Sequence, residues 1–415
     1  MKRIISMILA LALMVSFSAC NPFREWLAEE GERPVRTAEQ PERTQEPIVY
    51  GPYVFDEAKE MSAAQHLKYY ELDDAQKELY AQLYAGITNF ELRINIDPSW
   101  KADDRAEAFK TVYELLERNN PEIFWFPRAY ARGTYSDGAY SVRPKYLIDG
   151  GEFCTDKNAR NEIVCPPEEE IAAAKAWIEN GKTAVWAVIE SLPIHDGMTS
   201  FEREVAVHDW LAENVEYVED APNKTNLYGA LVEGRATCGG FAYSFQYIMR
   251  RMGIECLMYI GFLQENTDTK HVWNAVKLDG QWYQADVTSN ATAGKKIDEP
   301  RFHKYFNRTD EIMARTHIIE DVPWNPRIAC TATEYDYYKK SGAHIGSDED
   351  FVQRVPEVIA KARAQGAPTF ELEFAPGWAA PSEIDDKLDL IDREHYSDIT
   401  YYFQTSGTLV FGRFD

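Results

Sequence analysis

The chain has 415 residues, of which 45% are hydrophobic and 13% aromatic, enough apolar material for two or three folded domains. Its 68 acidic side chains outnumber its 44 basic side chains, so the formal net charge is −24. A charge of this sign and size disfavours binding to nucleic acid and to anionic lipid surfaces, and we expect neither as a partner. The same charge favours a well-solvated monomer.

Residues 1–20 have the pattern of a targeting segment. Two basic residues precede the apolar run 4–15, which is too short to span a bilayer, and the letters SAC end at Cys20. Small residues before a cysteine resemble a bacterial lipoprotein signal, which implies cleavage before Cys20 and a lipid on its thiol; an ordinary secretory signal is the alternative. We therefore expect a location on the extracytoplasmic face of the cell membrane, with the lipid as the only anchor. Residues 21–47, rich in Glu, Arg, Pro and Thr, are expected to form a flexible tether.

Residues 48–165 predict a small N-terminal α/β domain. The expected elements are helices over 73–87 and 104–118, strands over 90–96 and 123–126, and a hairpin about 136–138. We expect the aromatic residues of this part to pack in the core rather than to form a ligand platform. Cys154 and Cys165 flank a polar loop, and outside the cytoplasm a disulfide between them can persist. The sequence leaves open whether this bond forms.

Residues 166–329 predict a second, central domain that begins with helices. A helical region is expected from the proline pair at 166–167 to residue 192, and another helix over 199–214. Thr199 and a glutamate three residues later form a capping-box pattern at the start of the latter. His208 lies on its buried face, and we expect this histidine to be packed or hydrogen-bonded rather than catalytic.

Cys238 is expected to lie in the first turn of a helix, after Thr237 as the N-cap and before Gly253 as the C-terminal stop. The apolar residues between them recur at spacings of four, four and three, which is one helix face: Phe241, Phe245, Met249 and Met252. At a helix start, the unpaired backbone N–H groups and the positive end of the dipole favour a thiolate, the nucleophilic form of cysteine. The sequence therefore predicts a reactive thiol at this position.

Two β-like runs follow, over 270–278 and 281–287. They are joined by the letters DG, a two-residue hairpin signal. Such a turn places Leu278 opposite Gln281 and fixes the pairing of every residue before and after them.

Counting back along this hairpin places Trp273 opposite Asp286, and His271 on the same sheet face as both. His271 is then the diagonal neighbour of Asp286, within reach of its side chain. A carboxylate there can hold one imidazole nitrogen and leave the other for a thiol. Together with Cys238, the pair predicts a Cys–His–Asp nucleophile arrangement.

The same residues resemble the transglutaminase-like superfamily of cysteine enzymes. The matching letters are ATCGGFA around Cys238, HVWNAV at His271 and WYQADVTSN at Asp286, with VHDWLAENVEY and LYGALVEG upstream. The resemblance covers roughly residues 200–290. It implies an α+β, papain-like core in which a nucleophile helix packs on an antiparallel sheet, with Cys238 as nucleophile, His271 as base and Asp286 as the residue that orients the base. One departure is Ser289, where many relatives carry Trp after Asp-x-Thr.

An acyl-transfer site also needs donors for an oxyanion. The backbone N–H of Cys238 is one, and a second must come from the lead-in to the helix, where Tyr228 is the candidate. No pair of histidines shows metal-ligand spacing, so we expect neither a metal nor another cofactor.

Residues 330–415 predict a C-terminal α/β domain with a support or recognition role. The expected elements are a helix over 348–365, kinked or divided at Pro356, a strand over 370–374, a helix over 382–393, and a hairpin of 399–403 with 408–411.

These observations predict an acyl-transfer enzyme that acts on amide bonds of peptides, proteins or cell-wall peptides through a thioester on Cys238. The reaction ends in hydrolysis, as in a cysteine protease, or in transamidation, as in an acyltransferase. One alternative is a non-catalytic surface module that binds peptides or an envelope partner in the same cleft. Another is a scaffold in which only the flanking domains act. The reactivity of Cys238 distinguishes the enzyme from the alternatives.

Overall fold

The computed structural model describes residues 53, 55, 67–157, 163–294, 303–326, 328–364, 366, 369–379, 383–392, 399–403 and 409–414. The expected signal and tether, with Cys20, lie outside these residues. Among the helices that are described, none is both long and apolar enough to cross a membrane.

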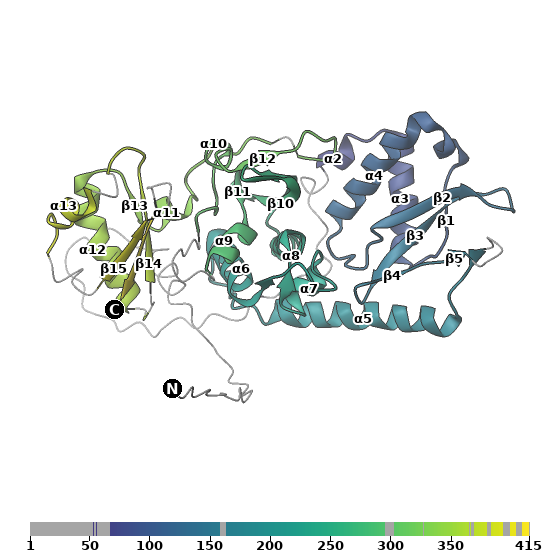
Figure 1. Ribbon diagram of the computed structural model, residues 1–415, viewed down its shortest axis with the longest axis horizontal. Coiled ribbons are helices and arrows are strands. Elements are labelled where there is room, and N and C mark those ends of the chain that lie inside the picture. The colour runs from purple at the N-terminus through teal and green to yellow at the C-terminus, as the bar shows by residue number, and fades with distance from the viewer. Residues whose placement is uncertain are drawn as a thin grey trace, which may run out of the picture.

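Three four-stranded sheets follow one another along the described chain, and Figure 1 shows them in a row. Each sheet is accompanied by helices that are close to it in sequence, so helices and strands are mixed throughout. The fold is therefore α+β, which confirms the predicted fold class.

The N-terminal sheet is antiparallel and lies beside two helices that pack on each other. Its strands are β1 (Ile94–Asn95), β2 (Ala129–Thr134), β3 (Tyr140–Ile148) and β4 (Gly151–Phe153). The helices are α3 (Asp74–Thr88) and α4 (Ala106–Asn119), close to the predicted ranges. The predicted hairpin is confirmed, because Thr134 pairs with Tyr140 across its turn.

Two strands that the sequence predicts in this part differ in the structure. The backbone of Phe90 turns just after α3, with φ of 56°, so the predicted strand over 90–96 shrinks to β1. Residues 123–126 form turns, with Ile123 N–H bonded to Asn120 O and Phe126 N–H to Ile123 O. All four of their side chains are nevertheless buried, so this apolar run joins the core, as its aromatic content suggests, without becoming a strand.

The bond between Cys154 and Cys165 does not form. The two residues flank a small hairpin of β5 (Asp156–Lys157) and β6 (Ile163–Val164). Continued beyond the paired residues, the register places Cys165 opposite Thr155 rather than opposite Cys154. Neighbouring residues of a strand point to opposite faces, so this register separates the two sulfurs.

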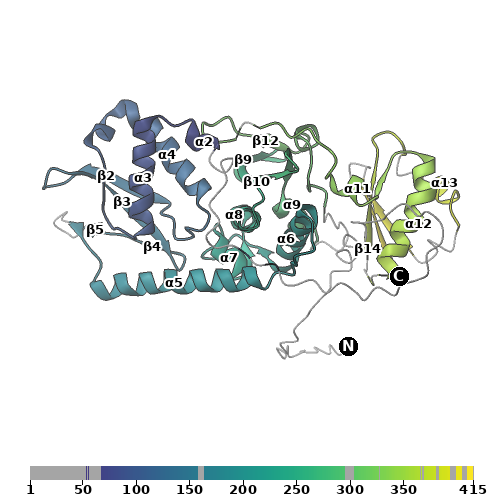
Figure 2. The same cartoon turned by 180° about the vertical axis from the view of Figure 1, so that it is seen from behind.

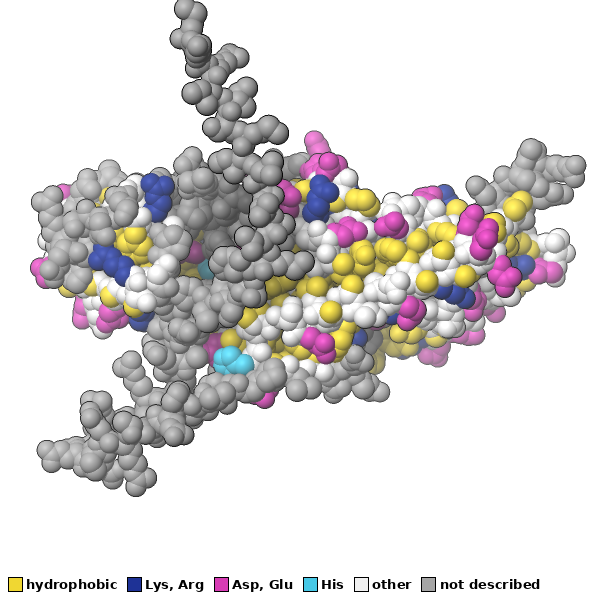
Figure 3. Space-filling view, turned by 90° about the horizontal axis from the view of Figure 1, so that it is seen from below, with side chains coloured by type: hydrophobic (Ala, Val, Ile, Leu, Met, Phe, Trp, Pro, Cys, Tyr) yellow, Lys and Arg dark blue, Asp and Glu magenta, His cyan; other side chains and the backbone are white. Residues whose placement is uncertain are grey.

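The long helix α5 (Glu168–Glu190) starts after the proline pair, as predicted, and runs beneath both the N-terminal and the central part (Figures 1 and 2). Its buried face is Ala174, Ile178, Gly181, Val185 and Ile189. Gly181 permits close packing, because a Cβ there would lie 2.6 Å from the ring of Phe124. Figure 3 shows the underside of the molecule, where apolar side chains gather along this region among scattered acidic ones.

The central part packs helix α8 (Cys238–Arg251) against an antiparallel sheet of order β11-β10-β9-β12. The strands are β9 (Cys256–Leu263), β10 (Asn266–Leu278), β11 (Gln281–Ala285) and β12 (His317–Ile319). Three further helices contact α8 (Figure 2): α6 (Ser200–Asn214), α7 (Leu227–Leu231) and α9 (Val287–Gly294). This is the predicted arrangement of a helix on an antiparallel sheet.

Helix α6 contains a fully buried carboxyl group, that of Glu204. Its Oε2 accepts a hydrogen bond from Asn307 Nδ2 at 2.8 Å, whereas its Oε1 finds no partner in the described part of the chain. Burial raises the pKa of Glu204 from 4.5 to about 8. The folded state thus prefers the neutral acid, and between these two pH values it loses about 1.4 kcal/mol of stability for each pH unit of increase.

We expect Glu204→Gln to remove this loss, because an amide does not ionise. The new amide also offers a donor to Asn307 Oδ1, which lacks a partner among the described residues. Urea unfolding at pH 5 and pH 8 measures the effect: the variant should gain stability relative to the wild type at the higher pH. Groups other than Glu204 titrate equally in both proteins, so they cancel in the difference between the two unfolding free energies. If that difference is the same at pH 5 and pH 8, the prediction is contradicted.

The C-terminal part is a mixed sheet of order β13-β14-β16-β15 with helix α12 (Asp348–Ala364). Its strands are β13 (His344–Ile345), β14 (Thr369–Phe374), β15 (Ile399–Phe403) and β16 (Leu409–Phe414). The alternating strand β14 and the terminal hairpin confirm the prediction. Helix α12 continues through Pro356 without dividing, and the predicted helix over 382–393 is shorter, as α13 (Ile384–Leu388).

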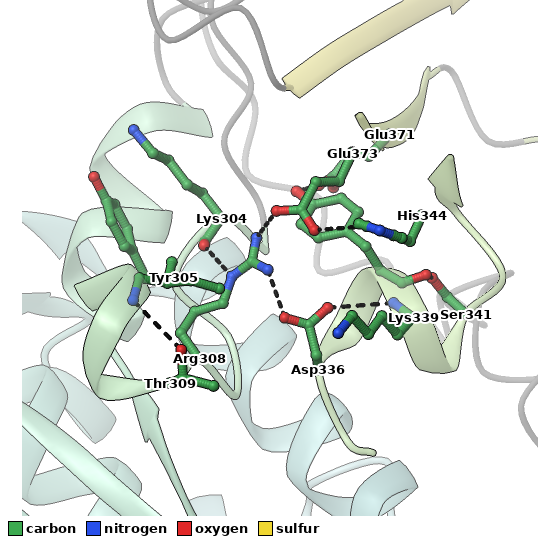
Figure 4. A network of polar contacts seen from close by, with 12 residues as sticks. Lys304, Tyr305, Arg308, Thr309, Asp336, Lys339, Ser341, His344, Glu371 and Glu373 are labelled. Carbon is green, nitrogen blue, oxygen red and sulfur yellow. Dashed lines mark hydrogen bonds and ion pairs between the residues drawn. The ribbon is translucent and has the colours of Figure 1, made fainter. Parts of the chain in front are cut away.

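Arg308 joins the C-terminal sheet to the central part (Figure 4). Its guanidinium donates to Asp336 Oδ2 at 2.5 Å, to Glu373 Oε1 at 2.7 Å and, through Nε, to the carbonyl oxygen of Lys304 at 2.6 Å. Glu373 lies on β14 and also accepts from His344 Nδ1 at 3.1 Å. Arg308 is fully buried, so these contacts fix the segment that precedes α10 (Asp310–Met313) against β14.

Candidate active site

Helix α8 begins at Cys238, whose side chain is half-buried. Thr237 occupies the N-cap position as predicted, but it does not cap the helix. Its N–H and hydroxyl both bond to the carbonyl oxygen of Lys224, at 2.7 Å and 3.3 Å. The first N–H groups of α8 therefore receive no side-chain cap, and they lie beside the sulfur.

Two glycines after Cys238 let the lead-in loop approach the start of α8. A Cβ on Gly239 would lie 2.8 Å from the carbonyl oxygen of Thr225, and one on Gly240 would lie 2.9 Å from that of Lys224. Both positions therefore require glycine for packing. The contact holds the helix start, and with it the sulfur, against the loop.

The β10–β11 hairpin has the predicted register, with Leu278 paired to Gln281. It brings His271 and Asp286 together, with His271 Nε2 at 2.8 Å from Asp286 Oδ2. Both side chains are buried. Trp273, two residues along β10, stacks on His271 with ring centroids 5.9 Å apart and planes at 19°. The shared sheet face that the sequence predicts is thus present.

His271 also interacts with Cys238. Because its Nε2 faces Asp286, Nδ1 is the nitrogen that remains for the sulfur. Burial opposes a charge on the ring, but the Asp286 carboxylate and Cys238 outweigh burial and raise the pKa of His271 from 6.5 to about 10. At neutral pH His271 is therefore an imidazolium, the partner that a thiolate needs.

Asp286 is held by two further residues. Its Oδ2 also lies 3.0 Å from His317 Nε2 and accepts the hydroxyl of Ser289, while its Oδ1 accepts Ser289 N–H at 3.0 Å. Burial disfavours the charge, but His271 and His317 outweigh it and hold the pKa of Asp286 well below its usual range. Ser289, the departure from the resemblance, thus places a hydroxyl on the carboxylate.

Tyr228 lies in an aromatic cluster. Its ring stacks on Phe124 at 5.3 Å between centroids and lies 5.1 Å from Trp177. A different tyrosine, Tyr217, interacts with the nucleophile: burial and the charge of Cys238 raise the pKa of Tyr217 to about 12. No sequence pattern points to this residue, although it ends the letters VHDWLAENVEY.

A second buried cluster of histidines lies in the central part. His208 Nδ1 and His303 Nε2 each lie 3.0 Å from Asp209 Oδ1, and His303 Nδ1 lies 3.1 Å from Glu371 Oε1 on β14. His208 is fully buried and hydrogen-bonded, as the sequence predicts, and its assignment as a structural rather than a catalytic residue stays a prediction.

Among the residues that the structure describes, two groups each bring three potential metal ligands within 4.8 Å of one another: His208, Asp209 and His303, and His271, Asp286 and His317. The sequence did not reveal them, because each group contains a histidine far along the chain from the other two members. Their facing atoms already pair with one another by hydrogen bonds. The expectation of no metal stays a prediction.

Comparison with known proteins gives a family for the residues around this site. Residues 193–287 match the model of the transglutaminase-like superfamily. This part of the chain belongs to that superfamily. The transglutaminase-like domain includes Cys238, His271 and Asp286, whereas His317 lies beyond the matched residues.

The transglutaminase-like domain is similar to part of kyphoscoliosis peptidase from Homo sapiens, with 25% identity over 109 residues. The match covers 23% of this chain and 16% of that relative, so the chain spans a small part of the relative's length. A relative of the same name from Mus musculus is 24% identical over the same length. Among solved structures, a TGase covers 39% of this chain and 44% of its own, with 14% identity and a TM-score of 0.25.

Proposed function

We propose that the transglutaminase-like domain is a cysteine acyl-transfer enzyme that acts on amide bonds of peptides or proteins. The observation that supports this most strongly is the chain of contacts from Cys238 through His271 to Asp286, with 2.8 Å between the latter two side chains. A thiol at a helix start, a charged imidazole and an ionised carboxylate are the groups that thioester chemistry requires.

In the first half-reaction, the Cys238 thiolate attacks the amide carbonyl carbon. The backbone N–H of Cys238 and the hydroxyl of Tyr217 are candidate donors to the oxyanion, where one donor is worth about 2.7–4 kcal/mol. Tyr217 keeps its proton at neutral pH, because its pKa is about 12. As the C–N bond breaks, His271 transfers its proton to the departing amine and the acyl group stays on sulfur as a thioester.

In the second half-reaction, neutral His271 takes a proton from a water or an amine that attacks the thioester. Water gives a carboxylic acid, an amine gives a new amide, and either product leaves the thiolate and imidazolium restored. Throughout, Asp286 keeps the ring oriented and stabilises its charge.

We further propose that the enzyme is anchored by lipid at Cys20 on the extracytoplasmic face of the cell membrane, as a monomer. This location rests on the N-terminal letters, and it favours peptides, proteins or cell-wall peptides as substrates. Domain boundaries near residues 165 and 330 belong to the same proposal, and they separate the three sheets of Figure 1.

Trapping of the thioester tests the activity. The soluble form that lacks residues 1–20 is incubated with glutamine-containing peptides and hydroxylamine, which converts a thioester to a hydroxamate. We expect hydroxamate from the wild type and from Cys165→Ala, which changes an exposed thiol, and none from Cys238→Ala. Absence of product from the wild type over a broad peptide panel would favour a non-catalytic binding module instead.

A further inference from the structure

We propose that His317 is a positioning residue of the Cys238–His271–Asp286 site, an inference that rests on the proposed function. His317 Nε2 lies 3.0 Å from Asp286 Oδ2, and His271 Nε2 lies 2.8 Å from the same oxygen. One carboxylate oxygen therefore faces two imidazoles. Of these two imidazoles, His271 is the one whose interaction with the Cys238 thiol is seen in the described part of the chain, so we expect His317 to act through the carboxylate.

The fold builds this contact from a distant part of the chain. His317 is the first residue of β12, which pairs with β9 through His317 and Leu263, while His271 lies on β10 on the other side of β9. Strand β12 thus belongs to the same sheet as the triad hairpin. It brings a third side chain to Asp286 that no local pattern around the hairpin contains.

The ring of His317 is fixed on several sides. It is 4% exposed, and its centroid lies 4.9 Å from that of Trp273 and 5.1 Å from that of Tyr305. Its Nδ1 lies 2.9 Å from the hydroxyl of Thr316. These contacts leave Nε2 directed at Asp286 and oppose rotation of the ring.

This geometry has a chemical consequence. A carboxylate oxygen can only accept, so Nε2 of His317 donates its N–H to Asp286 Oδ2. This hydrogen bond stabilises the ionised form of the Asp286 carboxylate. The carboxylate is kept in the orientation that serves His271, and Ser289 adds a further donor from α9.

Alkylation of Cys238 by iodoacetamide at pH 7, read by peptide mass spectrometry, tests the role without a substrate. Removing one hydrogen bond to a buried carboxylate should slow alkylation about tenfold in His317→Ala. His317→Gln places an amide N–H near the position of Nε2 and should recover most of the rate. The matched control is His303→Gln, a buried histidine that bonds to Asp209 instead of Asp286 and should leave the rate unchanged.

Circular dichroism shows which variants are folded at the temperature of the assay. Fast alkylation of Cys238 in the wild type, slow alkylation in His317→Ala and recovery in His317→Gln support the proposal. If His317→Ala reacts at the wild-type rate, the proposed function is unaffected, whereas the role of His317 is overturned. The same loss in His317→Gln and in the His303 control would also overturn it, since that pattern reflects general destabilisation. A wild-type Cys238 no faster than the exposed Cys165 would overturn the proposed function and this inference together.

Discussion

Asp286→Asn is expected to lower kcat for acyl transfer by roughly a thousandfold to ten-thousandfold, with little change in KM. Asp286 accepts hydrogen bonds from His271, His317 and Ser289. In Asp286→Asn an NH2 group replaces one carboxylate oxygen. This NH2 group faces the hydrogen-bond donors of His271, His317 and Ser289 without being able to accept from them, and it favours the wrong tautomer of His271. Steady-state kinetics with the best amide from the hydroxamate panel measure the loss.

A matched control exists in the second histidine cluster. Asp209 is also buried and also faces two histidines, but these are His208 and His303 instead of His271 and His317. Asp209→Asn should reduce thermal stability while leaving kcat intact where the protein is folded. Equal kcat losses in the two variants would contradict a specific role for Asp286.

Arg308→Met is expected to destabilise the folded protein by about 3–5 kcal/mol, the usual cost of removing one partner from a buried ion pair. The substitution leaves the carboxylates of Asp336 and Glu373 without the guanidinium that they share at 2.5 Å and 2.7 Å. The desolvation cost of both buried carboxylates is then no longer offset by the positive charge of Arg308. Urea unfolding at pH 7 measures the change.

Arg315→Met is the surface counterpart of this variant. Arg315 pairs with Glu311 at 3.2 Å, but the two side chains are 56% and 85% exposed, so the pair contributes at most about 1 kcal/mol. A loss in Arg308→Met no larger than that in Arg315→Met would contradict the view that Arg308 anchors the C-terminal sheet.

Local patterns explain which features the sequence could predict. The letters DG fix a two-residue turn, and the turn fixes the register that carries His271 to Asp286. The helix that starts at Cys238 follows from a four-residue apolar period and glycine punctuation. In each case the decisive contacts are made within one helix or one hairpin, so residues that are close in sequence determine the structure.

Contacts between distant segments explain which features the sequence could not predict. His317 reaches Asp286 because β12 pairs with β9, a pairing that no local pattern specifies. Tyr217 and Tyr228 both lie in the segment that leads to α8. Tyr228 packs against Phe124, whereas Tyr217 interacts with Cys238, and the sequence does not distinguish the two. At residue 90, a single positive φ outweighs an alternating pattern that would otherwise predict a longer strand.

The central claim is that His271 activates Cys238, and the relative alkylation rates of two thiols test it most directly. The soluble protein is treated with limiting iodoacetamide at pH 7, and modification of Cys238 and of the exposed Cys165 is followed by mass spectrometry in the wild type and in His271→Ala. We expect Cys238 to react faster than Cys165 in the wild type, although it is the less exposed thiol, and to lose this advantage in the variant. Equal rates in the wild type, or an advantage that survives in His271→Ala, would contradict it.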